Sequence, residues 1–452
     1  MAEIENDLLN IKDSLKREFK AEPFLPKKPI QDLGLSKVDG QRFSSKEFMN
    51  QEWNSIWKKT WQLVCRISDL ENKGAFYIHE LGKESFLIVK GDDGVIRGFY
   101  NVCQHRGNKL CQASIGATET FTCPYHGWQW NNDGSLKSIS SPEFFRQFDE
   151  GVPYEELSLP KVKVDFWGGW LWINMDLDPK GIGLQEYLGD YGQHLESYEF
   201  ENWDLIDYQS FEWNGNWKHA VDAFNESYHF ASLHPDMIQI SEGHDVPIEL
   251  NGIHSRMLNY NDTVSEVVTG DRDSWTPLRL KMMSVNEGYK GSAKDLHLSN
   301  IEMKRSQEED YPIYKQMNDE QLVHQYHYHF FPNATFTNKP ENGLVFRFRP
   351  HATNPNKSYY DFFILVNKVF VDNKSARPEH KLHKGNAPEV YQNAFDSTFN
   401  DVFSNVLAED ASNMETMQWG TKSDSFTGMN LCDQEIRIRH FHKTIDQFIS
   451  KG

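Results

Sequence analysis

The chain has no apolar run long enough to cross a membrane. Its longest strongly apolar stretch, FWGGWLWI at residues 166–173, is far shorter than the roughly 20 residues that a spanning helix needs. The N-terminal stretch is charged and has no apolar centre, so we expect no secretory signal. Basic residues are also scarce: 47 Lys and Arg oppose 66 Asp and Glu, a net charge of -19. We therefore expect a cytoplasmic protein that binds neither a membrane nor nucleic acid.

Cysteine is scarce and some common motifs are missing. The chain has five cysteines, an odd and scattered set that indicates metal or redox use rather than a disulfide framework. No G-x-G-x-x-G follows a strand, and no other glycine loop that could hold a phosphate is visible, so we expect no nicotinamide or flavin site. No serine elbow motif for hydrolysis is visible either.

The 452 residues of the chain divide into three regions by their sequence patterns. Residues 1–58 are polar and helix-like. Residues 59–176 contain short β-rich runs separated by Gly, Asp and Asn turns, which predict a small β domain. Residues 177–452 mix helical and strand patterns and predict an α+β domain with a sizeable antiparallel sheet. We expect the first region to pack on the third.

Two short motifs in the β-rich region carry metal-binding side chains. NVCQHRG supplies Cys103 and His105, and CPYHGW supplies Cys123 and His126. A structural zinc site is one interpretation, but zinc fingers usually group the cysteines in one knuckle and the histidines in another. A loop with one of each suits a binuclear iron–sulfur cluster in which one iron takes both thiolates and the other takes both imidazoles.

Residues 101–130 resemble the Rieske [2Fe-2S] motif of oxygenases over the whole stretch, including the Arg-Gly after the first histidine and the Gly-Trp after the second. The resemblance implies that Cys103 and Cys123 hold one iron while His105 and His126 hold the other. Cys111, between the two loops, is interpreted as a packing residue.

A second motif, NWKHAVDAFNESYHFASLHP at residues 216–235, contains Glu226, His229 and His234. Histidines five residues apart diverge by about 140° on a regular helix. Pro235 disfavours helix at the residue before it, so we expect His229 on the last regular turn and His234 at the exit. Two histidines and a carboxylate with open positions are typical of non-haem Fe(II) oxygenases.

This motif resembles the catalytic segment of Rieske non-haem iron oxygenases, specifically the large (alpha) subunit of aromatic-ring-hydroxylating dioxygenases. The family's carboxylate ligand lies in a later acidic helix. Matching LAEDASNMET to that helix implies Asp410 as the ligand, with Glu409 and Asp401 as competing candidates. The resemblance also implies that Glu226 is a bridging acid, bonded to His229 and to His126 of a neighbouring subunit, with Asp222 as a backup bridge.

The substrate pocket is predicted from the same resemblance. HQYHYHFF contains three histidines, of which His327 and His329 share one face of a strand while His324 lies on the other. We interpret this run as a pocket wall rather than a metal cluster. The predicted pocket residues are Phe224, Phe230, His329 and Val406.

The resemblance implies an α+β protein with a small all-β Rieske domain and a larger catalytic domain of the START/Bet v1-like helix-grip type. It also implies a [2Fe-2S] cluster, a mononuclear Fe(II), electrons from a separate ferredoxin or NAD(P)H-dependent reductase, and a homotrimer, possibly with a small beta subunit. The expected activity is mono- or dihydroxylation of an organic substrate with O2, and we expect an aromatic one. Alternatives are a Rieske monooxygenase or demethylase for non-aromatic or quaternary-ammonium compounds, a pure electron-transfer protein, and a zinc-containing ligand-binding module.

Overall fold

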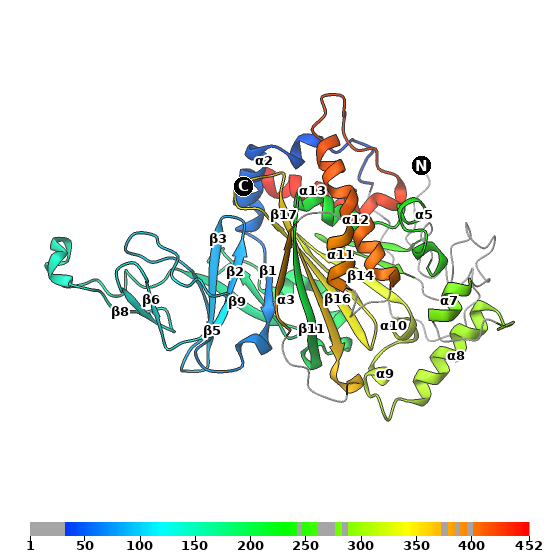
Figure 1. The fold of residues 1–452 in the computed structure, drawn as a ribbon, viewed down its shortest axis with the longest axis horizontal. Coiled ribbons are helices and arrows are strands. Elements are labelled where there is room, and N and C mark those ends of the chain that lie inside the picture. The colour runs from blue at the N-terminus through cyan, green and yellow to red at the C-terminus, as the bar shows by residue number, and fades with distance from the viewer. Residues whose placement is uncertain are drawn as a thin grey trace. The chain divides into compact units, whose positions relative to one another are not determined.

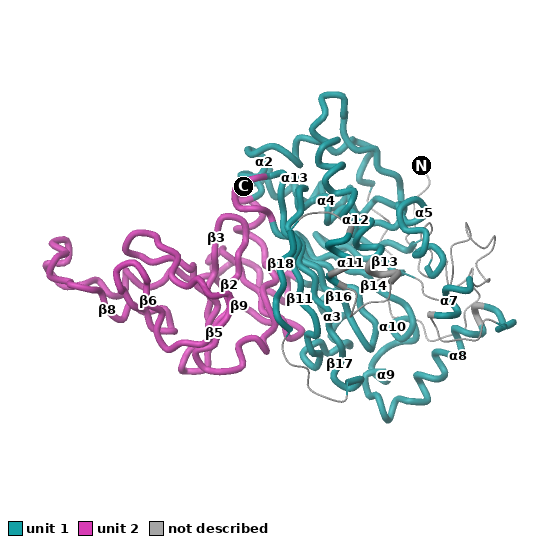
Figure 2. Tube along the Cα trace, in the orientation of Figure 1, with its two compact units in different colours: residues 1–52, 188–349, 355–452 teal, residues 53–187, 350–354 magenta. Residues whose placement is uncertain are grey.

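The computed structural model describes residues 32–241, 246–259, 276–282, 288–371, 378–384, 388–395 and 401–451. Two compact units make up the chain (Figure 2), one formed mainly by residues 53–187 and the other by residues 188–349 and 355–452 together with the N-terminal part. Most of the predicted N-terminal helical segment, residues 1–31, lies outside the described residues. The rest of that segment contains a short 3-10 turn at Gly40–Phe43, helix α2 at Lys46–Glu52 and a π-helical turn at Trp53–Trp57.

The smaller unit is built from two antiparallel sheets. The strands of the larger sheet, in spatial order, are β1 (Gln62–Arg66), β10 (Trp170–Asn174), β9 (Lys161–Trp167), β4 (Ile96–Tyr100), β3 (Glu84–Lys90), β2 (Ala75–Leu81) and β5 (Ile115–Ala117). The smaller sheet contains β6 (Thr120–Thr122), β7 (Gln129–Asn131) and β8 (Leu136–Ser138). The alternating apolar runs of the sequence explain both sheets, because their side chains form one buried core that includes Leu87, Val89, Phe99 and Trp130.

The larger unit is organised on one eight-stranded sheet. Its strands, in spatial order, are β12 (Ile248–Asn251), β13 (His254–Asn259), β14 (Gln325–Phe330), β15 (Ala334–Asn338), β16 (Asn342–Pro350), β17 (Ser358–Asn367), β11 (Trp203–Trp213) and β18 (Lys381–Lys384). Neighbouring strands from β12 to β16 run antiparallel. Strand β11 runs antiparallel to β17 and parallel to β18. The predicted antiparallel sheet is therefore present in the larger unit.

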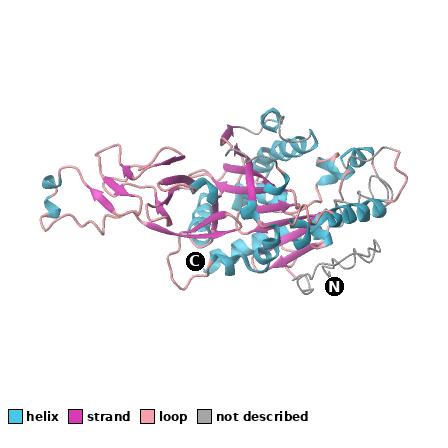
Figure 3. Ribbon diagram, turned by 90° about the horizontal axis from the view of Figure 1, so that it is seen from below, coloured by secondary structure: helices cyan, strands magenta, loops and turns pink. Residues whose placement is uncertain are grey.

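Helices surround this sheet (Figures 1 and 3). Their bounds are α3 Leu184–Leu195, α4 Trp217–Phe224, α5 Phe230–Leu233, α7 Pro277–Met282, α8 Ala293–Ser306, α9 Ile313–Gln316, α10 Asp319–Val323, α11 Pro388–Phe395, α12 Asp401–Gly420 and α13 Ile436–Lys451. Helices α4, α12 and α13 pack directly against the sheet. Among the described residues, no helix is long and apolar enough to cross a membrane.

The segment that carries the two histidines differs from our prediction. Helix α4 begins after Asn216, whose side chain accepts a hydrogen bond from the Lys218 N–H, and it ends at Phe224. We expected the helix to continue to His229, which is wrong. The sequence Asn-Glu-Ser that follows Phe224 ends the helix, because Asn and Ser side chains compete for backbone hydrogen bonds and have low helix propensity.

His229 and His234 instead flank one short helical turn. His229 is the residue before α5, and His234 is the residue after it. This arrangement brings the two imidazoles together without a bulge in a long helix, with ring centroids 4.9 Å apart. The residue after His234 is Pro235, which ends α5 as expected.

Candidate metal centres

The two Cys/His loops of the smaller unit have the same backbone hydrogen bonds. In each loop the cysteine N–H donates to the carbonyl five residues later, at 2.8 Å, and the N–H of a glycine four residues later donates to the cysteine carbonyl, at 3.0 Å. These residues are Cys103, Gly107 and Asn108 in the first loop and Cys123, Gly127 and Trp128 in the second. Both glycines have positive φ, 74° and 71°, a conformation that favours glycine. The Gly of each motif is therefore required by the turn.

In these two loops the cysteine side chains and the histidine side chains occupy different environments. Cys103 and Cys123 are buried, whereas His105 and His126 are partly exposed. The two imidazole rings lie 4.6 Å apart between centroids. Burial raises the pKa of the Cys103 thiol, and the hydrogen-bonded neighbour Cys123 raises it further. Sulfur paired with sulfur and nitrogen paired with nitrogen is the donor set of a binuclear cluster with one Cys₂ iron and one His₂ iron, so these residues fit a Rieske cluster.

Side chains around the loops hold the imidazoles in place. The ring of His105 stacks on Trp128, with centroids 4.8 Å apart, and the ring of His126 lies 3.9 Å from that of Tyr125. The Asn108 amide donates to the Cys123 sulfur at 3.9 Å. Cys111 is partly buried against the same core, as expected for a packing residue.

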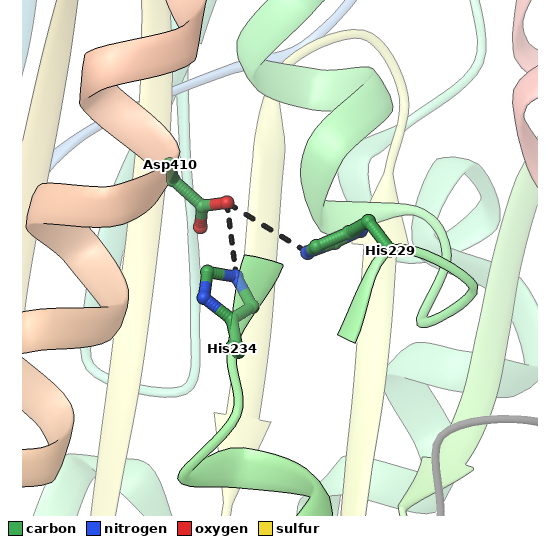
Figure 4. Close-up of side chains that lie close together, drawn as sticks. All are labelled: His229, His234 and Asp410. Atoms are coloured by element: carbon green, nitrogen blue, oxygen red, sulfur yellow. Dashed lines mark hydrogen bonds and ion pairs between the residues drawn. The ribbon is translucent and has the colours of Figure 1, made fainter. Parts of the chain in front are cut away.

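The larger unit contains three side chains that converge on one point (Figure 4). His229, His234 and Asp410 each offer one ligand atom, and these atoms all lie within 4.8 Å of one another. One Asp410 carboxylate oxygen lies 3.1 Å from Nε2 of His234 and 3.7 Å from Nε2 of His229. Helix α12 supplies the carboxylate, and the two ends of α5 supply the imidazoles.

Both histidines present the same nitrogen to the centre, because a carboxylate occupies the other one. Nδ1 of His229 is hydrogen-bonded to Glu226, and Nδ1 of His234 lies 2.8 Å from Glu409. A carboxylate on the outer nitrogen fixes the tautomer and orientation of a metal-bound imidazole. Burial lowers the pKa of His229, but the hydrogen bond to Glu226 and the charge of Asp410 outweigh it and raise the pKa overall. The site thus has the donor set and the negative potential of a cation site.

The structure separates the three candidate carboxylates. Asp410 faces both histidines, whereas Glu409 contacts His234 from the side away from Asp410. Adjacent residues on a helix point about 100° apart, so Glu409 and Asp410 cannot both face the same point. This spacing could have indicated from the sequence that Glu409 orients a histidine and does not compete with Asp410 as a metal ligand. The side chain of Asp401 lies outside the described residues.

The two acids proposed as bridges occupy different environments. Glu226 accepts hydrogen bonds from the backbone N–H and the ring of His229, although it lies between two helices and not on one helix face as we expected. Asp222 is buried and bonds to Nε2 of His442, at 3.1 Å. Sequence reasoning missed His442, because its partner is 220 residues away.

The predicted pocket residues fall into two groups. The ring of Phe230 lies 5.1 Å from that of His229 and 5.6 Å from that of His234. Phe224 packs against aromatic rings of the sheet. His329 lies near the Pro332 carbonyl and the ring of Phe441, and among the described residues no hydrogen bond or ring contact joins it or Val406 to the three converging side chains.

Among the described residues, the histidine run forms no group that could hold a metal ion, and its role as a pocket wall stays a prediction. His324 is the residue after α10 and stacks on His297, so it does not lie on the strand as we expected. His327 and His329 lie on β14 and are fully buried. The structure also adds two tyrosines near Asp410 that the sequence did not indicate. Burial raises the pKa values of Tyr360 and Tyr391, and the charge of Asp410 raises both further.

Comparison with protein families agrees with both sites. Residues 60–149 match the Rieske [2Fe-2S] domain, and residues 200–451 match the ring hydroxylating alpha subunit (catalytic domain). The chain belongs to the ring hydroxylating alpha subunit family. Its two domains are those that carry a Rieske [2Fe-2S] cluster and a mononuclear iron, as we predicted.

Several members of this family are similar in sequence. The carnitine monooxygenase oxygenase subunit of Acinetobacter baumannii is 32% identical over 205 residues, which cover 44% of this chain and 54% of that protein. The glycine betaine monooxygenase oxygenase subunit of Pseudomonas aeruginosa is 28% identical over 188 residues, 42% of each chain. Biphenyl 2,3-dioxygenase subunit alpha of Rhodococcus jostii is 27% identical over 237 residues, 47% of this chain and 48% of that protein. The chain thus matches about half of the length of these curated relatives.

Solved structures show the same fold. The quaternary ammonium Rieske monooxygenase CntA in complex with L-carnitine has a TM-score of 0.65 at 20% identity, covering 91% of this chain and 95% of that one. Naphthalene 1,2-dioxygenase with indole bound has a TM-score of 0.65 at 17% identity, covering 93% and 94%. The predicted α+β class, with a β Rieske domain and a larger catalytic domain on an antiparallel sheet, is confirmed.

Proposed function

We propose that this alpha subunit is the terminal oxygenase of a multicomponent Rieske system. The observation that carries the proposal is the convergence of His229, His234 and Asp410 within 4.8 Å, in a chain that also carries two matched Cys/His loops. When bound, the two groups supply one-electron storage at the cluster and O2 activation at the mononuclear iron.

The protein's own residues bind and orient these groups. Cys103, Cys123, His105 and His126 would hold the cluster. His229, His234 and Asp410 would hold the mononuclear iron, since two histidines with one carboxylate are the donor set of non-haem iron oxygenases. Glu226 and Glu409 orient the two imidazoles from outside.

We assign Glu226 a second role as the bridge between redox centres. The Glu226 side chain is 8% exposed and lies beside that of His229, which is 20% exposed. A nearly buried acid beside a partly exposed histidine suits a hydrogen bond to a histidine of a docked Rieske domain. Such a bridge needs a neighbouring subunit, so we propose a ring-like homotrimer. The electron donor would be a separate ferredoxin or reductase.

For the substrate, we favour the quaternary-ammonium class that the sequence analysis held as an alternative. Two relatives are named as carnitine and glycine betaine monooxygenases. An aromatic ring beside the predicted iron ligands adds to this choice: that of Phe230 lies 5.1 Å from the ring of His229 and 5.6 Å from the ring of His234. Aromatic faces attract a quaternary ammonium cation. Aromatic hydrocarbons are the second candidate, because the biphenyl dioxygenase subunit is also similar and flat rings pack well against the same faces.

Metal analysis and product analysis test this function together. We expect about three irons per chain in the purified protein, against about two for an electron carrier and one zinc for a binding module. His229→Ala should keep the colour of the cluster and abolish turnover. With a ferredoxin and reductase supplied, hydroxylation beside a quaternary nitrogen should release a tertiary amine and an aldehyde, whereas ring dihydroxylation adds both oxygen atoms to the product mass. A colourless protein would refute the proposal.

A further inference from the structure

Helix α13 places an arginine in the interior of the larger unit without an anion beside it. Arg437 is 0% exposed. Its Nε donates to the Ser255 hydroxyl at 3.0 Å, and its Nη2 lies 3.2 Å from Nδ1 of His327. Nη1 is buried and has no partner among the described residues. A buried cation with no counter-charge is costly, so natural proteins rarely keep one without a use.

The contact with Arg437 fixes the proton of His327. A guanidinium group only donates, so Nδ1 of His327 accepts and the ring proton lies on Nε2. This Nε2 is also buried and has no partner among the described residues. Two N–H donors, one of them charged, therefore lie in the interior without an acceptor. Burial and the charge of Arg437 hold the pKa of His327 well below its ordinary value, which keeps the ring neutral.

Other buried arginines in the same unit show what is missing. Arg347 and Arg349 both bond to the buried carboxylate of Asp361, at 2.7 Å and 2.5 Å. The acid on the neighbouring strand, Glu249, is already paired with Arg256 at 2.7 Å. No carboxylate of the described residues lies against Arg437. The buried Arg439 of the same helix also lacks a carboxylate among the described residues, but it donates to two backbone carbonyls, whereas Nη1 of Arg437 has no acceptor there.

The unpaired donors lie on segments that interact with the segments carrying the predicted iron ligands. The ring of His327 is stacked on that of Phe224 with centroids 6.4 Å apart, and Phe224 ends the helix just before Glu226 and His229. From the other direction, the charge of Glu435, two residues before Arg437, acts on His229 and on Glu226. Both segments that carry the donors thus lead to the mononuclear iron site.

We propose that Arg437 binds a carboxylate group of the substrate through Nη1. This assignment rests on the proposed function. A carboxylate supplies the missing charge, and a guanidinium is a preferred partner of that group. A buried water would accept the hydrogen bond of Nη1 but would leave the charge unbalanced. The ligand class is therefore a small carboxylic acid, and in the favoured substrate class a zwitterion with an ammonium at one end and a carboxylate at the other.

Calorimetric binding to the holoenzyme without O2 tests this. The probes are glycine betaine, L-carnitine and benzoate, with tetramethylammonium and benzyl alcohol as analogues that lack the carboxylate. We expect at least one carboxylate probe to bind, and we expect Arg437→Met to weaken that binding by about 100-fold. The same substitution should change the affinity for tetramethylammonium and benzyl alcohol little. Arg437→Lys keeps the positive charge but loses the planar guanidinium that can donate two parallel hydrogen bonds, so it should retain only part of the affinity.

Stability provides a readout that is independent of turnover. Arg437→Met removes an unpaired buried charge and keeps most of the volume, so the ligand-free protein should melt at a higher temperature than the wild type. The matched control is Arg439→Met. Arg439 donates to the carbonyls of Ser36 and Leu431, so its loss should lower the melting temperature and leave the preference for carboxylates unchanged.

Each outcome decides one of the two proposals. If no carboxylate probe binds the wild type, or if Arg437→Met binds carboxylates as the wild type does, the assignment of Arg437 is overturned. If carboxylates bind through Arg437 and yet no probe is oxidised, the carboxylate site stands and the proposed oxygenase function on these compounds fails.

Discussion

The carboxylate of Glu226 accepts two hydrogen bonds from His229, one from its backbone N–H at 3.1 Å and one from its ring Nδ1. The two residues are three apart in a non-helical connection, so the backbone contact itself fixes where the carboxylate lies. The acid thus has a position set by the chain and not by a flexible side chain alone. This relationship makes Glu226 the residue to test first.

Glu226→Gln should keep both metal centres and stall electron delivery. The amide oxygen still accepts from the ring of His229, so the imidazole stays oriented, but the negative charge of the bridge is lost. We expect the cluster to be reduced normally by the donor and to reoxidise slowly with substrate and O2, which stopped-flow absorbance measures. Normal reoxidation and turnover would show that Glu226 is not the bridge.

The loss of charge at Asp410 and at Glu409 should have different effects on iron binding. Asp410→Ala should lose the mononuclear iron and all turnover while the cluster remains. Glu409→Gln should retain the iron with an affinity lower by about 10- to 100-fold, because the orienting carboxylate on His234 is weakened. Iron content per chain after dialysis against a chelator measures both. Glu415→Gln, an exposed acid on the same helix, is the control and should bind iron as the wild type does.

His219 should make the fold sensitive to acid. Burial, assisted by the charge of Lys218, lowers the pKa of His219 from 6.5 to about 3. The unfolded chain takes up this proton below pH 6.5 while the folded chain does not, so the stabilisation is complete above pH 6.5 and is lost as the pH falls toward 3. The loss is about 1.4 kcal/mol per pH unit for this one group.

His219→Phe isolates that effect. Both ring nitrogens of His219 are buried without a partner among the described residues, and the ring stacks on Phe43 with centroids 4.1 Å apart. Phenylalanine keeps the stack and cannot be protonated, so urea unfolding should show equal or higher stability at pH 7 and a shallower decline below pH 6.5. His440→Phe, which loses a 2.9 Å hydrogen bond to the Gly252 carbonyl, should instead be destabilised at pH 7. An unchanged pH slope in His219→Phe would contradict the prediction.

Lys218 and Glu52 form an ion pair of 2.7 Å whose side chains are 0% and 2% exposed. Glu52→Gln should lower the free energy of unfolding by about 3 to 5 kcal/mol, because it leaves the ammonium buried without a counter-charge. The double change Glu52→Gln with Lys218→Met should recover most of that loss. Urea denaturation of the three proteins measures this, and equal stability of the single and double variants would contradict it.

Local patterns in the sequence predicted the metal-binding side chains better than the backbone structure and long-range packing that bring these side chains together. The Cys/His spacing and the glycine after each pair are short-range features, and the structure closes both loops with the same two hydrogen bonds. The position of Asp410 required a family resemblance, because no local pattern links it to a histidine 176 residues away. Pro235 correctly indicated the end of α5. The end of α4 at Phe224 was missed, because the helical pattern of the sequence continues through the Asn-Glu-Ser that follows, although Asn and Ser are weak helix formers.

Long-range partners were not predictable from the sequence. His442 meets Asp222 and Arg437 meets His327 only because α13 packs against strands and helices formed far earlier in the chain. Arg437 and Arg439 lie two residues apart on one helix and both are buried, so the sequence gives no sign that one bonds a histidine and the other backbone carbonyls. Their partners are a property of the packed molecule.

The three carboxylates gathered around His229 and His234 set an electrostatic preference for what enters. Glu226, Glu409 and Asp410 together against a divalent ion leave one surplus negative charge at the centre. This surplus charge disfavours a second anion at the centre, whereas a neutral molecule meets no such repulsion. A molecule that is positive at one end and negative at the other would be turned by this field, with its cationic head toward the metal and its tail away from it.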